Sequence, residues 1–161
     1  NNQAVAYRGL NNYQGALVAS EKAIALDPGY STSLNIRGWA LNGLGRYGEA
    51  LEPLNLAIAK HDDFTDAWVN KATALNGLKQ YGDALLAADK AVELGPENAS
   101  AWLIKATILE NTGKTAEAQQ AYAKAKELDP TLVKKTPLPA FIVCAGVGFT
   151  IAAFGFRKLR N

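Results

Sequence analysis

The chain of 161 residues contains no methionine, one cysteine and one histidine. A single cysteine cannot form an internal disulfide, and one cysteine with one histidine is too few for a Cys/His metal site. With a single histidine in the chain, we also expect no Ser-His-Asp or Cys-His pairing that would activate a nucleophile. We therefore expect no metal site and no cofactor, and we do not expect an enzyme.

Carboxylates are the remaining candidates for catalysis. Asp62, Asp63 and Asp66 lie close together in the sequence. No catalytic motif accompanies them. We interpret this run as a solvated loop.

The charge is distributed unevenly along the chain. Residues 1–132 contain 12 Lys and Arg against 15 Asp and Glu, which gives 12 − 15 = −3. Residues 133–161 contain the other 17 − 12 = 5 basic residues and no acidic one. Proteins that bind nucleic acid carry a basic face. Because the longer part has no basic excess, we expect no nucleic-acid partner.

A period of 34 residues organises most of the chain. Within one period, apolar residues recur at helical spacing on two successive stripes. In the third period, Trp68, Ala72 and Leu75 share the first stripe, and Pro96 follows the second as a helix stop. The pattern predicts two antiparallel helices per period. The positions that keep it are Ala16, Ala50, Ala84 and Ala118; Ala23, Ala57, Ala91 and Ala125; Tyr13, Tyr47 and Tyr81; Tyr7, Leu41, Leu75 and Leu109; Ala4, Gly38, Ala72 and Ala106; Pro28, Pro96 and Pro130.

This pattern resembles the tetratricopeptide repeat family, whose unit places an aromatic or Leu, small residues, a Tyr and a closing Pro at fixed positions. The segments LGRYGEALEPLNLAIA and AWVNKATALNGLKQYGDALLAADKAVELGPEN carry most of it. The resemblance implies an all-α solenoid of about three and a half to four helix pairs, because one pair cannot bury its apolar stripe alone. We predict a solenoid over residues 1–132, divided into a partial unit 1–30 and units 31–64, 65–98 and 99–132.

In this family the first helix of each pair lines a concave surface, which is the groove that the resemblance implies for a protein partner. Here that groove is neutral and rich in amides, and it lacks the Lys and Arg with which some family members clamp a peptide carboxylate. Trp39 is the aromatic expected either to be exposed in it as a contact residue or to pack at the junction between units. The predicted contact residues are Asn35, Trp39, Asn42, Asn70, Thr73, Asn76, Thr107 and Asn111.

The end of the chain has a different character. From Pro137 to Phe156 there are 20 residues without a charge, and basic residues flank them. A helix of that length spans about 30 Å, which is the thickness of a bilayer core. We predict a Lys/Pro linker at 133–139 and a hydrophobic helix with a basic end at 140–161, in contact with membrane lipid through residues 137–156. Burial against other protein is the alternative.

Small residues recur every four positions in this predicted helix, at Ala140, Cys144, Gly148 and Ala152. Such strips let helix backbones approach closely, so we predict a helix–helix association surface. The tail also resembles the surface-sorting tails of archaea and bacteria, although KKTPLPAF lacks a clear sorting motif.

The flanking charges favour an orientation for the repeats. Three basic residues follow the apolar run and two precede it, so the positive-inside rule favours repeats outside the cytoplasm, at the cell surface. A cytosolic, tail-anchored orientation stays open. The Asn98-Ala99-Ser100 triplet is a candidate glycosylation site if the repeats lie outside.

The sequence therefore predicts a non-catalytic scaffold for protein–protein interaction. It is expected to be anchored in a membrane, or to self-assemble into a homo-oligomer or surface filament through the hydrophobic helix and repeat stacking. Two alternatives remain, an accessory or assembly subunit of a membrane protein complex and a tail-anchored cytosolic adaptor.

Overall fold

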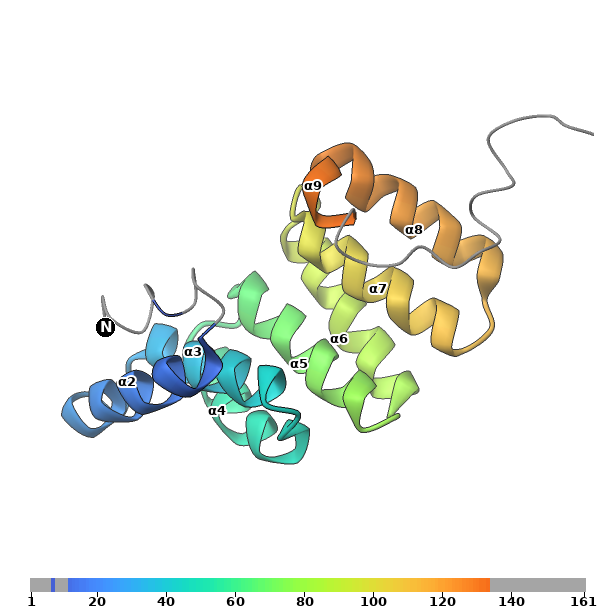
Figure 1. Ribbon diagram of the computed structural model, residues 1–161. Coiled ribbons are helices and arrows are strands. Elements are labelled where there is room, and N and C mark those ends of the chain that lie inside the picture. The colour runs from blue at the N-terminus through green and yellow to red at the C-terminus, as the bar shows by residue number, and fades with distance from the viewer. Residues whose placement is uncertain (1–6, 8–11, 134–161) are drawn as a thin grey trace, which may run out of the picture.

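The computed structural model describes residue 7 and residues 12–133, and this part is entirely helical (Figure 1). The predictions for the linker, the hydrophobic helix, its small-residue strip and the start of the first unit fall largely on other residues, outside those that the structure describes. The helices are α2 (Tyr13–Leu26), α3 (Ser31–Gly43), α4 (Tyr47–Lys60), α5 (Thr65–Gly77), α6 (Tyr81–Leu94), α7 (Ala99–Asn111), α8 (Thr115–Leu128) and the short α9 (Pro130–Val133).

The seven helices from α2 to α8 alternate between 14 and 13 residues. Short turns join α3 to α4, α5 to α6 and α7 to α8, and each pair packs side by side. In the first of these turns, the Arg46 N–H donates to the carbonyl of Leu41 over 2.9 Å, which satisfies a carbonyl at the helix end. The same bond recurs from Gln80 to Leu75 and from Lys114 to Leu109.

The alanines of the 34-residue pattern form the core of each pair. Ala50, Ala57 and Ala84 are completely buried, and Ala118 is 1% exposed. A methyl group at these positions lets two helix axes approach closely while apolar surface is still removed from water.

The pairs stack in chain order into a solenoid, from α2 at the lower left of Figure 1 to α8 at the upper right. Each first helix packs on the next first helix, as α3 does on α5 and α5 on α7, and each second helix packs on the first helix of the following pair. Leu51 of α4 contacts apolar clusters on both sides of one such junction, so the core continues from unit to unit.

No helix within residues 12–133 has the length and apolar character needed to span a bilayer. The predicted membrane segment, residues 137–156, lies outside this range.

Candidate functional site

A hollow of about 310 Å³ opens over the first helices α3 and α5. It brings together four of the eight predicted groove residues, while Asn35, Asn76, Thr107 and Asn111 lie outside its lining. We call it the first-helix hollow. Its lining residues are Tyr13, Trp39, Asn42, Gly43, Tyr47, Val69, Asn70, Thr73 and Ser100.

Three of the predicted groove asparagines join α3 to α5. Asn70 donates through Nδ2 to Oδ1 of Asn35 over 2.8 Å, and Asn42 donates through Nδ2 to the backbone carbonyl of Asn70 over 2.8 Å. Their exposed fractions are 1% for Asn35, 8% for Asn42 and 6% for Asn70. Hydrogen bonds between buried groups hold the two helices in one register. In the chain without a partner, these three asparagines therefore link one repeat to the next.

Two buried amide atoms have no hydrogen-bond partner within the described residues, Nδ2 of Asn35 and Oδ1 of Asn42. A buried acceptor without a donor is costly, by about 1–3 kcal/mol. Asn42 lines the first-helix hollow. Its Oδ1 is thus a buried acceptor without a donor on a residue of the hollow's lining.

The remaining groove asparagines and threonines are held by further hydrogen bonds, one between helices and two within a helix. Asn111 donates through Nδ2 to Oδ1 of Asn76 over 2.9 Å, an asparagine link of the same kind between α5 and α7 at other positions of the repeat. The hydroxyls of Thr73 and Thr107 donate to the carbonyls of Val69 and Leu103, each over 2.9 Å.

Aromatic rings form one end of the first-helix hollow. The ring centroids of Tyr13 and Trp39 are 4.8 Å apart and their planes are inclined by 51°. Tyr13 sits against Gly43, where an added Cβ would lie 2.2 Å from the ring, and Tyr47 sits against Gly77 in the same way, at 2.6 Å. The two glycines are therefore needed for the close approach of the tyrosines.

Sequence reasoning missed Tyr13, Tyr47 and Gly43 as parts of this site. The signal was present, because Tyr13 and Tyr47 are one period apart and so are Gly43 and Gly77. The tyrosines belong to second helices, whereas the search for groove residues considered only first helices.

The first-helix hollow has no charged side chain in its described lining. Farther along α7, Glu110 accepts a hydrogen bond of 2.8 Å from the hydroxyl of Tyr122. Burial is the main cause that raises the pKa of the Tyr122 phenol above its ordinary value, so this group stays neutral and keeps its donor role.

Asn98, the candidate glycosylation residue, caps helix α7. Its Oδ1 accepts from the backbone N–H groups of Ser100 and Ala101, at 3.0 and 3.3 Å. An Asn at this position supplies partners to helix-end donors. Glycosylation of Asn98 stays a prediction.

The described residues also contain no group of three or more His, Cys, Asp or Glu side chains that could hold a metal ion. The predicted association residues Ala140, Cys144, Gly148 and Ala152 lie outside the described part of the chain.

Comparison with protein-family models matches residues 1–63 and 69–132 to the model described as tetratricopeptide repeat. The chain belongs to the tetratricopeptide repeat family. Its fold is a scaffold typical of protein–protein interaction, and proteins of this family are generally non-catalytic. None of the curated proteins compared with the chain matches it.

Several solved structures share the fold. A thermophilic TPR protein of Thermus thermophilus is 20% identical with a TM-score of 0.74, over 79% of this chain and 71% of that one. A fragment of MamA from Desulfovibrio magneticus RS-1 is 23% identical with a TM-score of 0.67, over 80% and 72% of the two chains. The OM64 TPR domain of Arabidopsis is 20% identical with a TM-score of 0.63, over 68% and 90%. At these identities the likeness concerns the fold alone.

Proposed function

We propose that this protein is a non-catalytic scaffold that binds an extended segment of a protein partner in the first-helix hollow. The observation that carries the proposal is the combination of Trp39, Tyr13 and Tyr47 with amide and hydroxyl groups in one hollow of about 310 Å³. Binding sites of this kind join aromatic surface to a few placed polar groups.

Each part of the hollow has a role in this proposal. The aromatic rings take an apolar or aromatic side chain of the partner, because such rings bury large areas with little loss of side-chain entropy. Asn42 and Thr73 are placed to exchange hydrogen bonds with the partner's backbone. Since no described Lys or Arg lines the hollow, a partner that depends on a carboxylate is disfavoured there.

A displayed library of random peptides tests the proposal. We expect selected peptides to carry an aromatic or large apolar residue and few acidic ones, and to lose at least about tenfold in affinity with Trp39→Ala, equivalent to about 1.4 kcal/mol. Leu56→Ala is the matched control, because Leu56 is 46% exposed on α4 and does not line the hollow. Equal losses for the two variants, with helical content unchanged, would contradict a site at Trp39.

We also propose, as a separate function, that residues 137–156 attach the repeats to a membrane or to other copies of the chain. The uncharged run of 20 residues with basic flanks supports this, and repeats facing away from the cytoplasm are part of the same proposal. Sedimentation of the full chain with and without detergent tests it. Polymers that pellet without detergent favour assembly, particles dispersed only in detergent favour an anchor, and a dispersed monomer without detergent rejects both. Copurification with other chains at fixed stoichiometry would favour an accessory subunit.

A further inference from the structure

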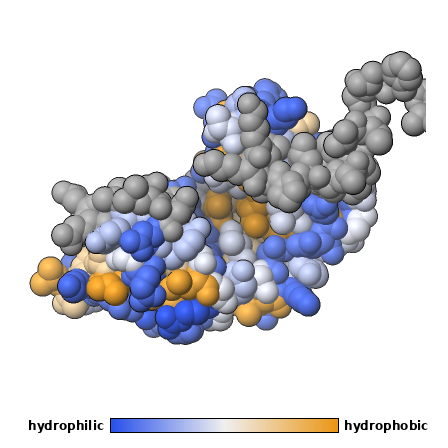
Figure 2. Space-filling model, viewed as in Figure 1, coloured by the Kyte–Doolittle hydropathy of each residue, from blue (hydrophilic) through white to orange (hydrophobic). Residues whose placement is uncertain are grey.

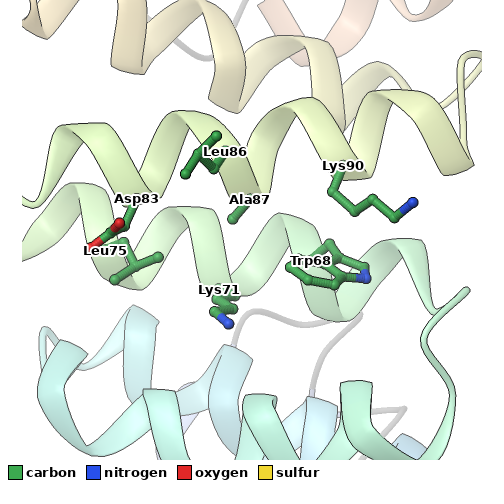
Figure 3. A pocket seen from close by; sticks show the side chains of 7 residues that line it. All are labelled: Trp68, Lys71, Leu75, Asp83, Leu86, Ala87 and Lys90. Carbon is green, nitrogen blue, oxygen red and sulfur yellow. The ribbon is translucent and has the colours of Figure 1, made fainter.

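Two hollows of the same construction occur one unit apart and share no lining residue with the first-helix hollow. The first lies between α5 and α6 with a volume of about 450 Å³, and the second lies between α7 and α8 with about 370 Å³. The α5/α6 hollow is lined by Trp68, Lys71, Leu75, Asp83, Leu86, Ala87 and Lys90 (Figure 3). The α7/α8 hollow is lined by Trp102, Lys105, Leu109, Glu117, Gln120, Ala121 and Lys124, each 34 positions later.

The tryptophans present carbon surface to these hollows. The Nε1–H of Trp68 donates to the carbonyl of Asp62, and that of Trp102 to the carbonyl of Pro96, each over 2.8 Å. Their polar groups are thus already satisfied. Leu86 forms part of the α5/α6 hollow and is 69% exposed, although large apolar side chains gain most from burial. In Figure 3 Trp68 and Leu75 lie on α5, with Leu86 and Ala87 on α6 beside them.

Apolar surface is patchy on the face of the molecule that Figure 2 shows, where orange residues occur in separate groups among blue ones. The lining of the α5/α6 hollow combines apolar side chains with the charged Lys71, Lys90 and Asp83.

The second lysine of each hollow is paired in the same way, Lys90 with Glu93 and Lys124 with Glu127, each at 3.0 Å. The two hollows differ in how the first lysine is compensated. Lys71 lies 5.2 Å from the ring centroid of Trp68, and Lys105 lies 5.7 Å from that of Trp102. Lys105 also pairs with the carboxylate of Asp89 at 2.7 Å. Asn55 occupies the position 34 residues before Asp89. In the part of the chain that the structure describes, Lys71 has no ion pair, so its charge is available to an anionic partner.

The hollows are not a feature of every unit of the repeat. In the preceding unit, Leu34 and Pro53 stand at the positions of Trp68 and Ala87. Leu34 is 2% exposed and Pro53 is buried. Arg37 stands at the position of Lys71, but it lies 3.9 Å from the carboxylate of Glu52. Units 65–98 and 99–132 thus share a tryptophan-lined hollow that unit 31–64 does not repeat.

We propose that the α5/α6 and α7/α8 hollows together form a docking surface for an acidic amphipathic helix of a partner protein. Adjacent helices such as α5 and α7 pack about 8–10 Å apart, and residues i and i+7 of a helix are separated by about 10.5 Å along its axis. Apolar side chains at these two positions enter the two hollows. A neighbouring Asp or Glu pairs with Lys71, and this charge complementarity selects an acidic partner over a basic one.

The probes are fluorescent helical peptides with Leu, Phe or Trp at i and i+7 and Glu on the flanks, measured against the full chain by polarisation. A matched set with Lys in place of Glu serves as the comparison. We expect the best acidic probe to bind at least tenfold tighter than its Lys counterpart and to shift the indole N–H resonances of Trp68 and Trp102. Equal binding of the two sets, or no saturable binding by any acidic probe, overturns the proposal.

Variants locate the contact. Lys71→Met is expected to weaken the acidic probe about fivefold to tenfold, and Lys105→Met less, because Lys105 already has Asp89. Leu86→Gln, which copies the α7/α8 hollow, is expected to weaken it severalfold. An unchanged affinity for Lys71→Met, with helical content retained, also overturns the proposal. Self-association of the chain that Leu86→Gln abolishes would assign the surface to a second copy instead.

Discussion

At the scale of single residues, three equivalent turns differ in one side chain. Gly45, Lys79 and Gly113 are each one period apart, and their φ values are 74°, 62° and 77°. This left-handed region costs an L-residue about 1–2 kcal/mol, whereas glycine enters it freely. Lys79 is therefore the strained member of the set.

Replacing Lys79 with glycine should stabilise the protein. We expect Lys79→Gly to raise the free energy of unfolding by about 1 kcal/mol, because the native strain is relieved at a small entropic cost. Urea unfolding followed by circular dichroism measures it. The matched change Gly45→Lys should lower the same quantity by a similar amount, and a stability loss with Lys79→Gly would show that the lysine side chain compensates its strain.

The site was only partly predictable at this scale. The spacing placed Asn35 and Asn70 on the face of the first helices, but it could not show that their amides meet each other across α3 and α5 at 2.8 Å. Whether a polar side chain faces solvent or its counterpart depends on the distance between helices. The position of α3 among its neighbours depends on residues such as Gly38 and Gly43, which face Leu54 of α4 and Tyr13 of α2.

At the scale of helices, the fit between α3 and α4 depends on one pair of residues. A Cβ added at Gly38 would lie 2.4 Å from Cγ of Leu54. Leu54 is completely buried. One unit later the same two positions hold Ala72 and Ala88, both completely buried, so a larger first residue faces a smaller second one. The helix pairs therefore keep their packing by exchanging volume across the contact.

This compensation of side-chain volume predicts that substitutions at the two positions have coupled effects on stability. Gly38→Ala should destabilise the protein by about 1–3 kcal/mol through overpacking, and Leu54→Ala by about 2–5 kcal/mol through the cavity it leaves. Together they reproduce the Ala72–Ala88 pair, so the double variant should lose less than the sum. Chemical unfolding of all four proteins gives the coupling energy. Strict additivity would mean that the two side chains are not opposed in solution.

The sequence was more informative about elements than about single contacts. The 34-residue period predicted the helix pairs, because alanines at fixed positions and helical spacing depend on local geometry that every unit repeats. The repeat register also expects Pro53 inside the second helix of its unit, and α4, which runs from Tyr47 to Lys60, contains it. A proline in a helix is tolerated where the surrounding packing compensates for its missing N–H.

At the scale of the whole molecule, each helix is stabilised by the helices of neighbouring units that pack on it. Helix α5 packs on α3, α4, α6 and α7, whereas α8 packs mainly on α7 and α9 among the described elements. In solenoids of this kind, stability is approximately a sum over units and the interfaces between them. The middle of the array should therefore open less often than its end.

Hydrogen exchange measures this difference in opening free energy between the middle and the end of the array. We expect amides in the middle of α5 to be protected at least about tenfold more than those in the middle of α8, which corresponds to about 1.4 kcal/mol in opening free energy. Exchange followed by mass spectrometry resolves the two helices. Equal protection would show that the array opens as one cooperative unit.

The recurring interface between successive first helices also bears on how such a chain changes over evolutionary time. The contact of α3 with α5 is repeated by α5 with α7, so a duplicated copy of residues 65–98, placed after Asn98, would meet surfaces that its parent already meets. Array length can therefore grow by duplication in steps of one unit without the invention of a new interface. The hollows between α5 and α6 and between α7 and α8, which match position for position, have the form that one such duplication followed by divergence of the side chains would leave.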